Sequence, residues 1–276
     1  MTEPVAVTSG GAPDYRAALF TRDGDVFTPS PSAKGGWGQS VSGHVVGGIL
    51  AWAAERMTDD PQMQPARLTV DIPRPMALEP VELTSRVLRD GKRLRLVEVV
   101  VEQNGDAVAR ATALFLRRGP QPEGQTWSPE LDMPQVPQDF RDEDASLFVR
   151  TYGWGVPLQK PEPGWPEPGP KYTWLYLNQP IVDGEPLSPF VAAAMAGDVT
   201  ASLGNWGTNG LQFINADYTL TLSRLPEGPL IGLAAQGHCS NDGVASASAT
   251  LVDQRGPFGH GVSVALAHSG FRPTSA

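Results

Sequence analysis

The sequence predicts an α+β fold in which two antiparallel sheets are each wrapped around a central helix. Three observations lead to this prediction. The segment 43–56 is apolar on nearly all sides, as a buried helix is. Behind it, apolar and polar residues alternate between favoured turn dipeptides, which indicates antiparallel strands. The same order of one helix and several strands returns roughly 150 residues later, so we expect a helix packed on a sheet twice over.

The first buried helix is expected from about Ser42 to Met57. Serine is a favoured N-cap residue, and the apolar residues that follow at helical spacing are Val45, Val46, Ile49, Leu50 and Ala53. Gly47 and Gly48 each cost about 1 kcal/mol relative to alanine inside a helix. We therefore expect another backbone, or a ligand, to come very close to them.

The strands of the first half are expected at 15–20, 26–27, 68–73, 81–89, 94–103 and 108–117. Asp90-Gly91 and Asn104-Gly105 lie between alternating apolar segments and predict two-residue hairpin turns.

Proline divides the chain into two halves. Eleven prolines fall between residues 119 and 170, which predicts a connector laid over the surface. We expect a first domain at 1–118 and a Pro-rich linker at 119–146. The second domain, 147–276, contains a further Pro-rich segment near 157–170.

The second half repeats the plan of the first. Its helix is expected at 189–203, with Ser188 as the cap and Pro189 at the first helical position. Its strands are expected at 147–154, 172–177, 212–224, 229–238, 244–254 and 261–268, with turns at 241–243 and 255–256. In both halves a strand ends at an Arg and a Pro and is followed by Glu, Pro and a new strand, so we interpret the two as a duplicated unit.

Composition excludes some classes of function. The net charge of −9 and the pI near 4.9 predict a surface that repels phosphate backbones, so nucleic acid is not an expected partner. A single cysteine, Cys239, leaves no internal disulfide and suggests a reducing compartment. The first 15 residues lack a signal-peptide pattern, and the apolar run 45–54 is about half of what spans a bilayer. We expect a cytoplasmic protein without a membrane span.

Several short motifs resemble a known family, the type II acyl-CoA thioesterases, which carry two hotdog units in one chain. The motifs are Gly43-His44-Val45-Val46-Gly47, Arg89-Asp90-Gly91-Lys92, Ala196-Gly197-Asp198, Arg224 with Pro226, and Leu251-Val252-Asp253. The resemblance covers most of the chain except the linker. It implies a double hotdog fold and a site where the two halves meet, which binds acyl-CoA or another acyl thioester.

The resemblance also implies the residues that would hold and activate a water. The family uses an Asp on the second central helix, a Thr or Asn on the next strand, and a Gln near the C-terminus. Asp198 matches the first, and Asn215 falls where the second is expected. The third falls near Ser263, where a short hydroxyl side chain replaces the amide. Thioester hydrolysis is the expected reaction; an acyl-CoA-binding protein with weak turnover is the alternative that the missing Gln leaves open.

Asp198 is a candidate general base on its own sequence context. Its helical neighbours are small or apolar, so its carboxylate is expected to be partly desolvated or held by a partner such as Asn215. Deprotonated, it would activate a water for attack on the thioester carbonyl. The alternative is an acidic residue that merely reaches the edge of the helix.

The first helix supplies the candidate substrate-binding residues His44, Gly47 and Gly48. The glycines could offer backbone N–H groups to a carbonyl oxygen, and tight packing of helix on sheet would need the same glycines. His44 is a candidate hydrogen-bond donor or a structural residue. Together with Asp198 it would mimic the His/Asp pair of hotdog dehydratases, so a hydratase or dehydratase is the third interpretation.

Other chemistries have no pattern in the sequence. We find no Gly-x-Ser-x-Gly elbow, metal-ligand spacing, phosphate loop or dinucleotide fingerprint, so no metal or organic cofactor is expected. Cys239 follows His238, but adjacent strand residues face opposite sides, so we expect Cys239 to serve packing. A homodimer is expected by analogy, because hotdog sheet edges often pair with a second copy.

Overall fold

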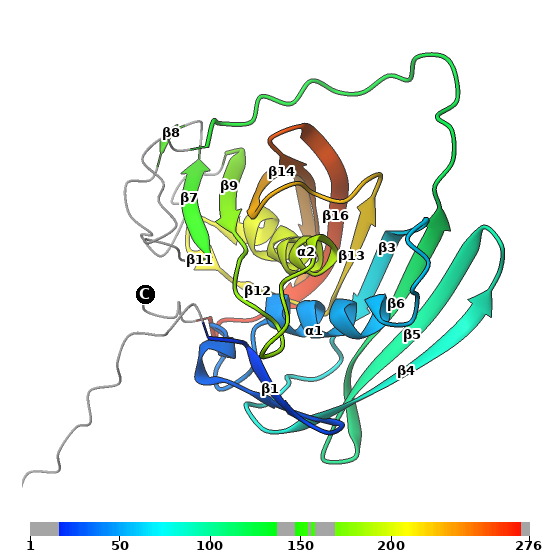
Figure 1. The fold of residues 1–276 in the computed structure, drawn as a ribbon. Helices are drawn as coiled ribbons and strands as arrows, with labels where there is room; N and C mark the ends of the chain where they lie inside the picture. The colour runs from blue at the N-terminus through cyan, green and yellow to red at the C-terminus, as the bar shows by residue number, and fades with distance from the viewer. Residues whose placement is uncertain (1–16, 137–146, 154–155, 158–168, 272–276) are drawn as a thin grey trace, which may run out of the picture.

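The computed structural model describes residues 17–136, 147–153, 156–157 and 169–271 (Figure 1). In the first half the elements are β1 (Phe20–Asp23), β2 (Val26–Pro29), a 3-10 turn (Pro31–Ala33), α1 (Gly43–Glu55), β3 (Met63–Asp71), β4 (Val81–Asp90), β5 (Leu94–Gln103) and β6 (Asp106–Arg117). In the second half they are β7 (Phe148–Gly153), β8 (Val156–Pro157), β9 (Lys171–Tyr176), α2 (Pro189–Asn205), β10 (Trp206–Gly207), β11 (Gly210–Leu211), β12 (Phe213–Asn215), β13 (Asp217–Leu222), β14 (Leu230–Asn241), β15 (Val244–Asp253) and β16 (Gly256–Ala267).

One continuous sheet replaces the two separate sheets expected from the sequence. Its order is β1-β2-β4-β5-β6-β3-β13-β16-β15-β14-β9-β7-β8, with β12 also paired to β16. The halves join where β3 and β13 run antiparallel, with Thr69 opposite Thr219. Their hydroxyl oxygens lie 3.1 Å apart. The prediction of two sheets was wrong because an edge strand in each half satisfies its free N–H and C=O groups by pairing with the other.

The two helices lie side by side against this sheet, as Figure 1 shows. α1 contacts the strands β3 to β6, while α2 contacts β9 and the strands from β12 to β16. Both helices are buried over most of their length, since ten of the 13 residues of α1 are buried. Neither described helix combines the length and the apolar content needed to cross a bilayer.

The helix starts differ in how they are capped. Ser188 caps α2 as predicted, because its Oγ accepts a hydrogen bond of 3.2 Å from the N–H of Val191. Ser42 precedes α1, but its side chain makes no cap bond to the backbone. Its hydroxyl bonds Nδ1 of His44 at 2.7 Å instead. Ser42 is therefore the N-cap residue of α1 as predicted, but the capping bond expected from its side chain was wrong.

The hairpin at Asn104-Gly105 is confirmed, with φ of 54° and 81° at the two turn residues. The expected turn at Asp90-Gly91 was wrong, because Asp90 still pairs with Arg95 and the strands connect through residues 91–93. A bulge in β4 after Val87 shifts the register there.

Two strand predictions also need correction. The strand expected at 15–20 begins only at Phe20, and residues 15–16 lie outside the described part. The strand expected at 212–224 is split at Ala216 into β12 and β13.

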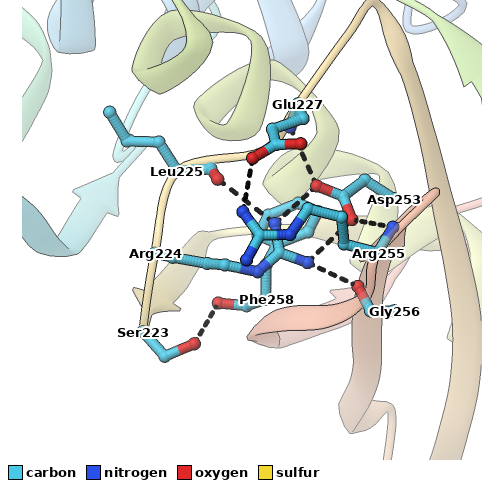
Figure 2. Close-up of polar contacts among 8 residues, drawn as sticks. All are labelled: Ser223, Arg224, Leu225, Glu227, Asp253, Arg255, Gly256 and Phe258. Atoms are coloured by element: carbon cyan, nitrogen blue, oxygen red, sulfur yellow. Dashed lines mark hydrogen bonds and ion pairs between the residues drawn. The ribbon is translucent and has the colours of Figure 1, made fainter. Parts of the chain in front are cut away.

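An ion pair fixes the far end of the second half, shown in Figure 2. Arg224 donates to both oxygens of Asp253, at 2.5 Å and 2.7 Å. The backbone N–H groups of Glu227 and Arg255 donate to the same carboxylate, each at 2.8 Å. Burial would raise the pKa of Asp253, but these bonds outweigh it and lower the pKa. The cluster therefore ties the end of β13 to the turn between β15 and β16.

Candidate active site

Asp198 lies where the two helices meet. It is the tenth residue of α2, and its partly buried carboxylate lies against Gly43, the first residue of α1. A Cβ atom at position 43 would overlap the carboxylate, so only glycine allows this approach. The acidic group therefore lies at the N-terminus of α1, where the positive end of the helix dipole favours negative charge.

Asn215 is the polar companion of Asp198. It is the last residue of β12, and its Nδ2 donates a hydrogen bond of 3.0 Å to Oδ1 of Asp198. Among the described residues, no hydrogen bond reaches Oδ2 of Asp198. This oxygen therefore keeps its hydrogen-bonding capacity for a water or a substrate. The structure thus brings together two of the three side chains that the sequence proposed for catalysis.

The carboxylate of Asp198 holds its proton more tightly than an exposed aspartate does. Burial raises its pKa from 3.8 to about 6, and the hydrogen bond from Asn215 acts against that rise. At neutral pH the group is mostly ionised, yet it is a much stronger base than an ordinary carboxylate. This combination suits general-base catalysis.

Ser263 does not join the pair. It is 3% exposed and faces inward from β16, but its Oγ donates to the carbonyl oxygen of Asp217 at 2.9 Å. The residue of β16 that lies directly opposite Asn215 is Ala265. The inward position next to Asn215 is therefore two residues beyond the predicted one, and it carries a methyl group.

His44 lies beside the site without contacting the acid through a hydrogen bond. Its Nδ1 bonds the hydroxyl of Ser42. Burial lowers its pKa from 6.5 to about 4, so the ring is neutral at pH 7. A neutral imidazole that accepts a hydrogen bond at Nδ1 from the hydroxyl of Ser42 carries its own N–H at Nε2 and can donate from there.

Gly47 and Gly48 are packed against protein side chains. A Cβ on Gly47 would overlap the hydroxyl of Tyr218, and one on Gly48 would overlap Ile181 and Met195. Both lie beyond the first turn of α1, where N–H groups bond within the helix. Val45 and Val46 both donate to the carbonyl of Ser42, whereas the N–H groups of Gly43 and His44 have no backbone acceptor within the described residues.

Tyr218 is a residue that the sequence analysis did not single out. It is fully buried on β13, and its hydroxyl donates to the carbonyl of Ala194 at 2.9 Å, one helical turn before Asp198. Its ring lies against Gly197 and its hydroxyl against Gly47. Burial raises the pKa of Tyr218, and the charge of Asp198 raises it further. A large aromatic residue on a strand, with one glycine in each helix, was the signal available in the sequence.

A pocket lies between the C-terminal end of α1 and the N-terminal end of α2. It is lined by Trp52, Glu55, Arg56, Ile181, Val182, Glu185, Pro186, Leu187, Ser188 and Val191. Burial raises the pKa of Glu55 there. Trp52 donates from its indole to Glu185, which also pairs with Arg56. None of the predicted catalytic residues lines this pocket.

The remaining candidates take no part in the site. Cys239 is exposed, so the packing role expected for it was wrong. His238 bonds Asn205 and Ser240. In the described part of the chain, no group of three or more His, Cys, Asp or Glu residues could hold a metal ion.

One family model matches the first half of the chain. Residues 33–116 match the family model described as the acyl-CoA thioesterase N-terminal domain. This match confirms the resemblance to a thioesterase-like family. The comparison with curated proteins gives no match.

Solved structures share the fold over nearly the whole chain. A protein described as a thioesterase II of Thermobifida fusca YX is 16% identical over 91% of this chain and 97% of its own, with a TM-score of 0.65. A protein with a hot dog fold from Alicyclobacillus acidocaldarius is 16% identical over 92% and 98%, with a TM-score of 0.64. The acyl-CoA thioesterase II TesB2 of Mycobacterium marinum is 17% identical over 92% and 95%, with a TM-score of 0.61. At these identities the likeness shows the fold alone, which is the hotdog fold.

Proposed function

We propose that this chain, whose residues 33–116 match an acyl-CoA thioesterase domain, hydrolyses an acyl thioester such as acyl-CoA. The observation that carries the proposal is the Asp198–Asn215 pair at the N-terminus of α1. The pair provides a base of raised pKa, a fixed amide and a helix end that stabilises negative charge, within one small region. General-base hydrolysis of a thioester uses all three.

The reaction then proceeds in two steps. A water bound at Oδ2 of Asp198 gives its proton to the carboxylate while its oxygen forms a bond to the thioester carbonyl carbon. The N–H groups of Gly43 and His44 stabilise the negative charge on the carbonyl oxygen. The C–S bond then breaks, and the proton on Asp198 passes to the departing thiolate. The products are a carboxylic acid and a thiol, so Asp198 is regenerated.

We further propose that the chain is a double hotdog with one active site, with the domain limits expected from the sequence. Trp52 is the tenth residue of α1, as Asp198 is the tenth of α2. Trp52 lines the pocket near Ser188, the cap of α2, just as Asp198 lies near the start of α1. The strand order outward from β3 also matches the order outward from β13. In this arrangement an indole takes the place of the acid in the first unit, so only one site carries a base.

One observation favours a second candidate function. The hydroxyl of Ser263 is engaged by the backbone of Asp217, so no third polar side chain from β16 reaches Asn215 in the described part of the chain. A site built this way could bind acyl-CoA and turn it over slowly.

A panel of thioesters tests the proposal. Purified protein and the Asp198→Asn variant are mixed with acyl-CoA of several chain lengths, with an enoyl-CoA and with a 3-hydroxyacyl-CoA. Release of free thiol that Asp198→Asn lowers by about a thousandfold supports hydrolysis. Binding of acyl-CoA without thiol release supports the binding protein. Conversion of the enoyl or 3-hydroxyacyl group with the thioester intact would assign the site to a hydratase or dehydratase and would refute the proposal.

A further inference from the structure

The outer face of the sheet in the first half has an apolar centre. In the pairing of β5 with β6, Leu94 lies opposite Leu116 and Leu96 opposite Leu114. Val97 and Phe115, which alternate with these leucines, are buried in the core. Because successive strand residues face opposite sides, the four leucines lie on the side away from α1. Leu116 is 42% exposed, so this face is open to solvent.

Basic residues surround the four leucines. Arg67 lies opposite Leu114 on β3, and Arg89 lies opposite Leu96 on β4. Lys92 and Arg93 form the exposed turn between β4 and β5. We call these four cations and the four leucines the leucine–arginine face. Figure 1 shows β4, β5 and β6, which carry most of this face, on the side of the molecule away from α2.

The cations of the leucine–arginine face have no anionic partners. Within the described part of the chain, none of these four side chains makes a hydrogen bond or ion pair. The Nε atom of Arg67 is buried, so the exposed cations are Arg89, Lys92 and Arg93. The acidic groups nearby are already engaged by other arginines: Asp60 by Arg117, Asp90 by Arg95, and Glu98 by Arg86. The protein as a whole carries a net charge of −9. Free positive charge is therefore concentrated on one apolar face of an acidic protein.

We propose that the leucine–arginine face docks this protein on an anionic lipid surface. Lys and Arg side chains held near an anionic leaflet are attracted to its phosphates, and the leucines add apolar area that enters the headgroup region. Two copies of this face would repel each other, because both carry free cations. A protein partner would need fixed, directional contacts, whereas these long side chains are unrestrained by bonds and suit a fluid array of phosphates.

The docking face lies far from the proposed active site, and the inference does not depend on thioester hydrolysis. Arg95, in the same hairpin, donates to the carbonyl of Met57 at 2.8 Å, just past the C-terminal end of α1. Asp198 lies at the other end of α1, and a helix of 13 residues is about 20 Å long. Docking would thus leave the region around Gly43 and Asp198 uncovered.

Vesicle co-sedimentation tests the proposal. The full chain is mixed with vesicles of equal parts phosphatidylglycerol and phosphatidylcholine, and with vesicles of phosphatidylcholine alone. We expect binding to the anionic vesicles only, weakened when salt is raised. The Lys92→Glu/Arg93→Glu variant should bind at least about tenfold more weakly. The matched control, Arg74→Glu/Arg255→Glu, makes the same change in charge at two exposed arginines outside this face, and should bind within about threefold of wild type.

A second variant tests the apolar part. Leu116→Gln keeps every cation and should weaken binding about threefold to tenfold. Circular dichroism confirms that each variant is folded. Equal binding by wild type and by both charge variants would overturn the proposal, as would no binding to anionic vesicles. Binding of poly-L-glutamate without vesicle binding would assign the face to an acidic protein. Dimer formation that Lys92→Glu/Arg93→Glu abolishes, again without vesicle binding, would assign it to a second copy.

Discussion

At the scale of a single residue, two opposing influences act on the pKa of Asp198. Burial raises its pKa, while the amide of Asn215 and the end of α1 stabilise its charge. The balance leaves a group that is ionised at neutral pH and still strongly basic. A fully exposed aspartate would be too weak a base, and a fully buried one without Asn215 would stay protonated.

We predict that the rate of hydrolysis depends on the ionisation of Asp198. Because its pKa is about 6, kcat/KM should rise about tenfold per pH unit below pH 6 and level off above pH 7. A pH profile of thiol release between about pH 4.5 and 8 checks this. An acid limb near pH 4 would mean that the carboxylate is ordinary and that another group supplies the base.

The same raised pKa predicts a cost in stability. A carboxyl group whose pKa is higher in the folded protein binds its proton more tightly there, so the folded state is favoured at low pH and loses that advantage as pH rises through about 6. Asp198→Asn removes the charge. We expect the variant to be more stable than wild type at pH 8, by about 1 kcal/mol because the group is partly exposed.

Chemical denaturation of both proteins at two pH values measures this difference. It should shrink towards zero below about pH 3, where Asp198 is protonated in both folded and unfolded chains. An Asp198→Asn variant less stable than wild type at pH 8 would show that the carboxylate is a stabilising ion, which would remove the argument for a strong base.

We predict unequal effects for the two other catalytic candidates. Asn215→Ala removes the bond to Asp198, so kcat should fall about a hundredfold. The acid limb of the pH profile should also move upward, because Asn215 lowers the pKa of Asp198. Ser263→Ala should change kcat less than about threefold, since its hydroxyl bonds the backbone of Asp217. Equal losses in the two variants would place Ser263 in the site after all.

The structure brings two of these three residues together, and their catalytic role stays a prediction. Asp198 and Asn215 follow from the resemblance, and the small neighbours of Asp198 made its burial predictable. The inward orientation of Ser263 agrees with strand alternation. The register between β12 and β16, which are about 50 residues apart, decides which inward residue of β16 lies beside Asn215. The sequence of one strand alone does not reveal that register.

At the scale of elements, the two helices are held at close distance by glycines and one tyrosine. Tyr218 occupies the space that side chains on Gly47 and Gly197 would fill. Its bond to the carbonyl of Ala194 fixes the turn of α2 that precedes Asp198. The sequence predicted a close approach at Gly47 and Gly48; the structure supplies protein side chains as the neighbours, and a substrate-binding role for these glycines stays a prediction.

We predict that Gly47→Ala destabilises the protein by more than about 2 kcal/mol, because its Cβ would overlap the hydroxyl of Tyr218. Gly119→Ala is the control, since nothing lies near the added atom; it should change stability by less than about 0.5 kcal/mol. Tyr218→Phe in the Gly47→Ala background should recover part of the loss. Thermal unfolding of the four proteins checks this, and equal melting temperatures for the two glycine variants would contradict it.

Local signals predicted the elements better than they predicted the connections between them. The cap at Ser188 and the turn at Asn104-Gly105 depend on neighbouring residues only, and both are confirmed. The two-residue turn expected at Asp90-Gly91 failed because Asp90 still pairs with Arg95, so the strands connect through residues 91–93, and a bulge after Val87 shifts the register nearby. A bulge is a property of two paired strands, so the sequence of one strand does not reveal it.

At the scale of the whole molecule, the pairing of β3 with β13 makes two repeated halves into one sheet. It also sets the helices next to each other, so that an acid from one half meets the helix start of the other. Neither half alone holds both Asp198 and Gly43. The duplicated pattern predicted the halves, whereas the continuous sheet follows only when their edges are brought together.

The central claim is that Asp198 activates a water that attacks the thioester directly. The most direct measurement is a single turnover in water labelled with oxygen-18, with protein in excess over acyl-CoA, followed by mass spectrometry of the released acid and of the peptide that contains Asp198. We predict that the label enters the acid and that the peptide stays unlabelled. An unlabelled acid with label in Asp198 would show that the carboxylate attacks the thioester itself, and absence of any released acid would contradict hydrolysis.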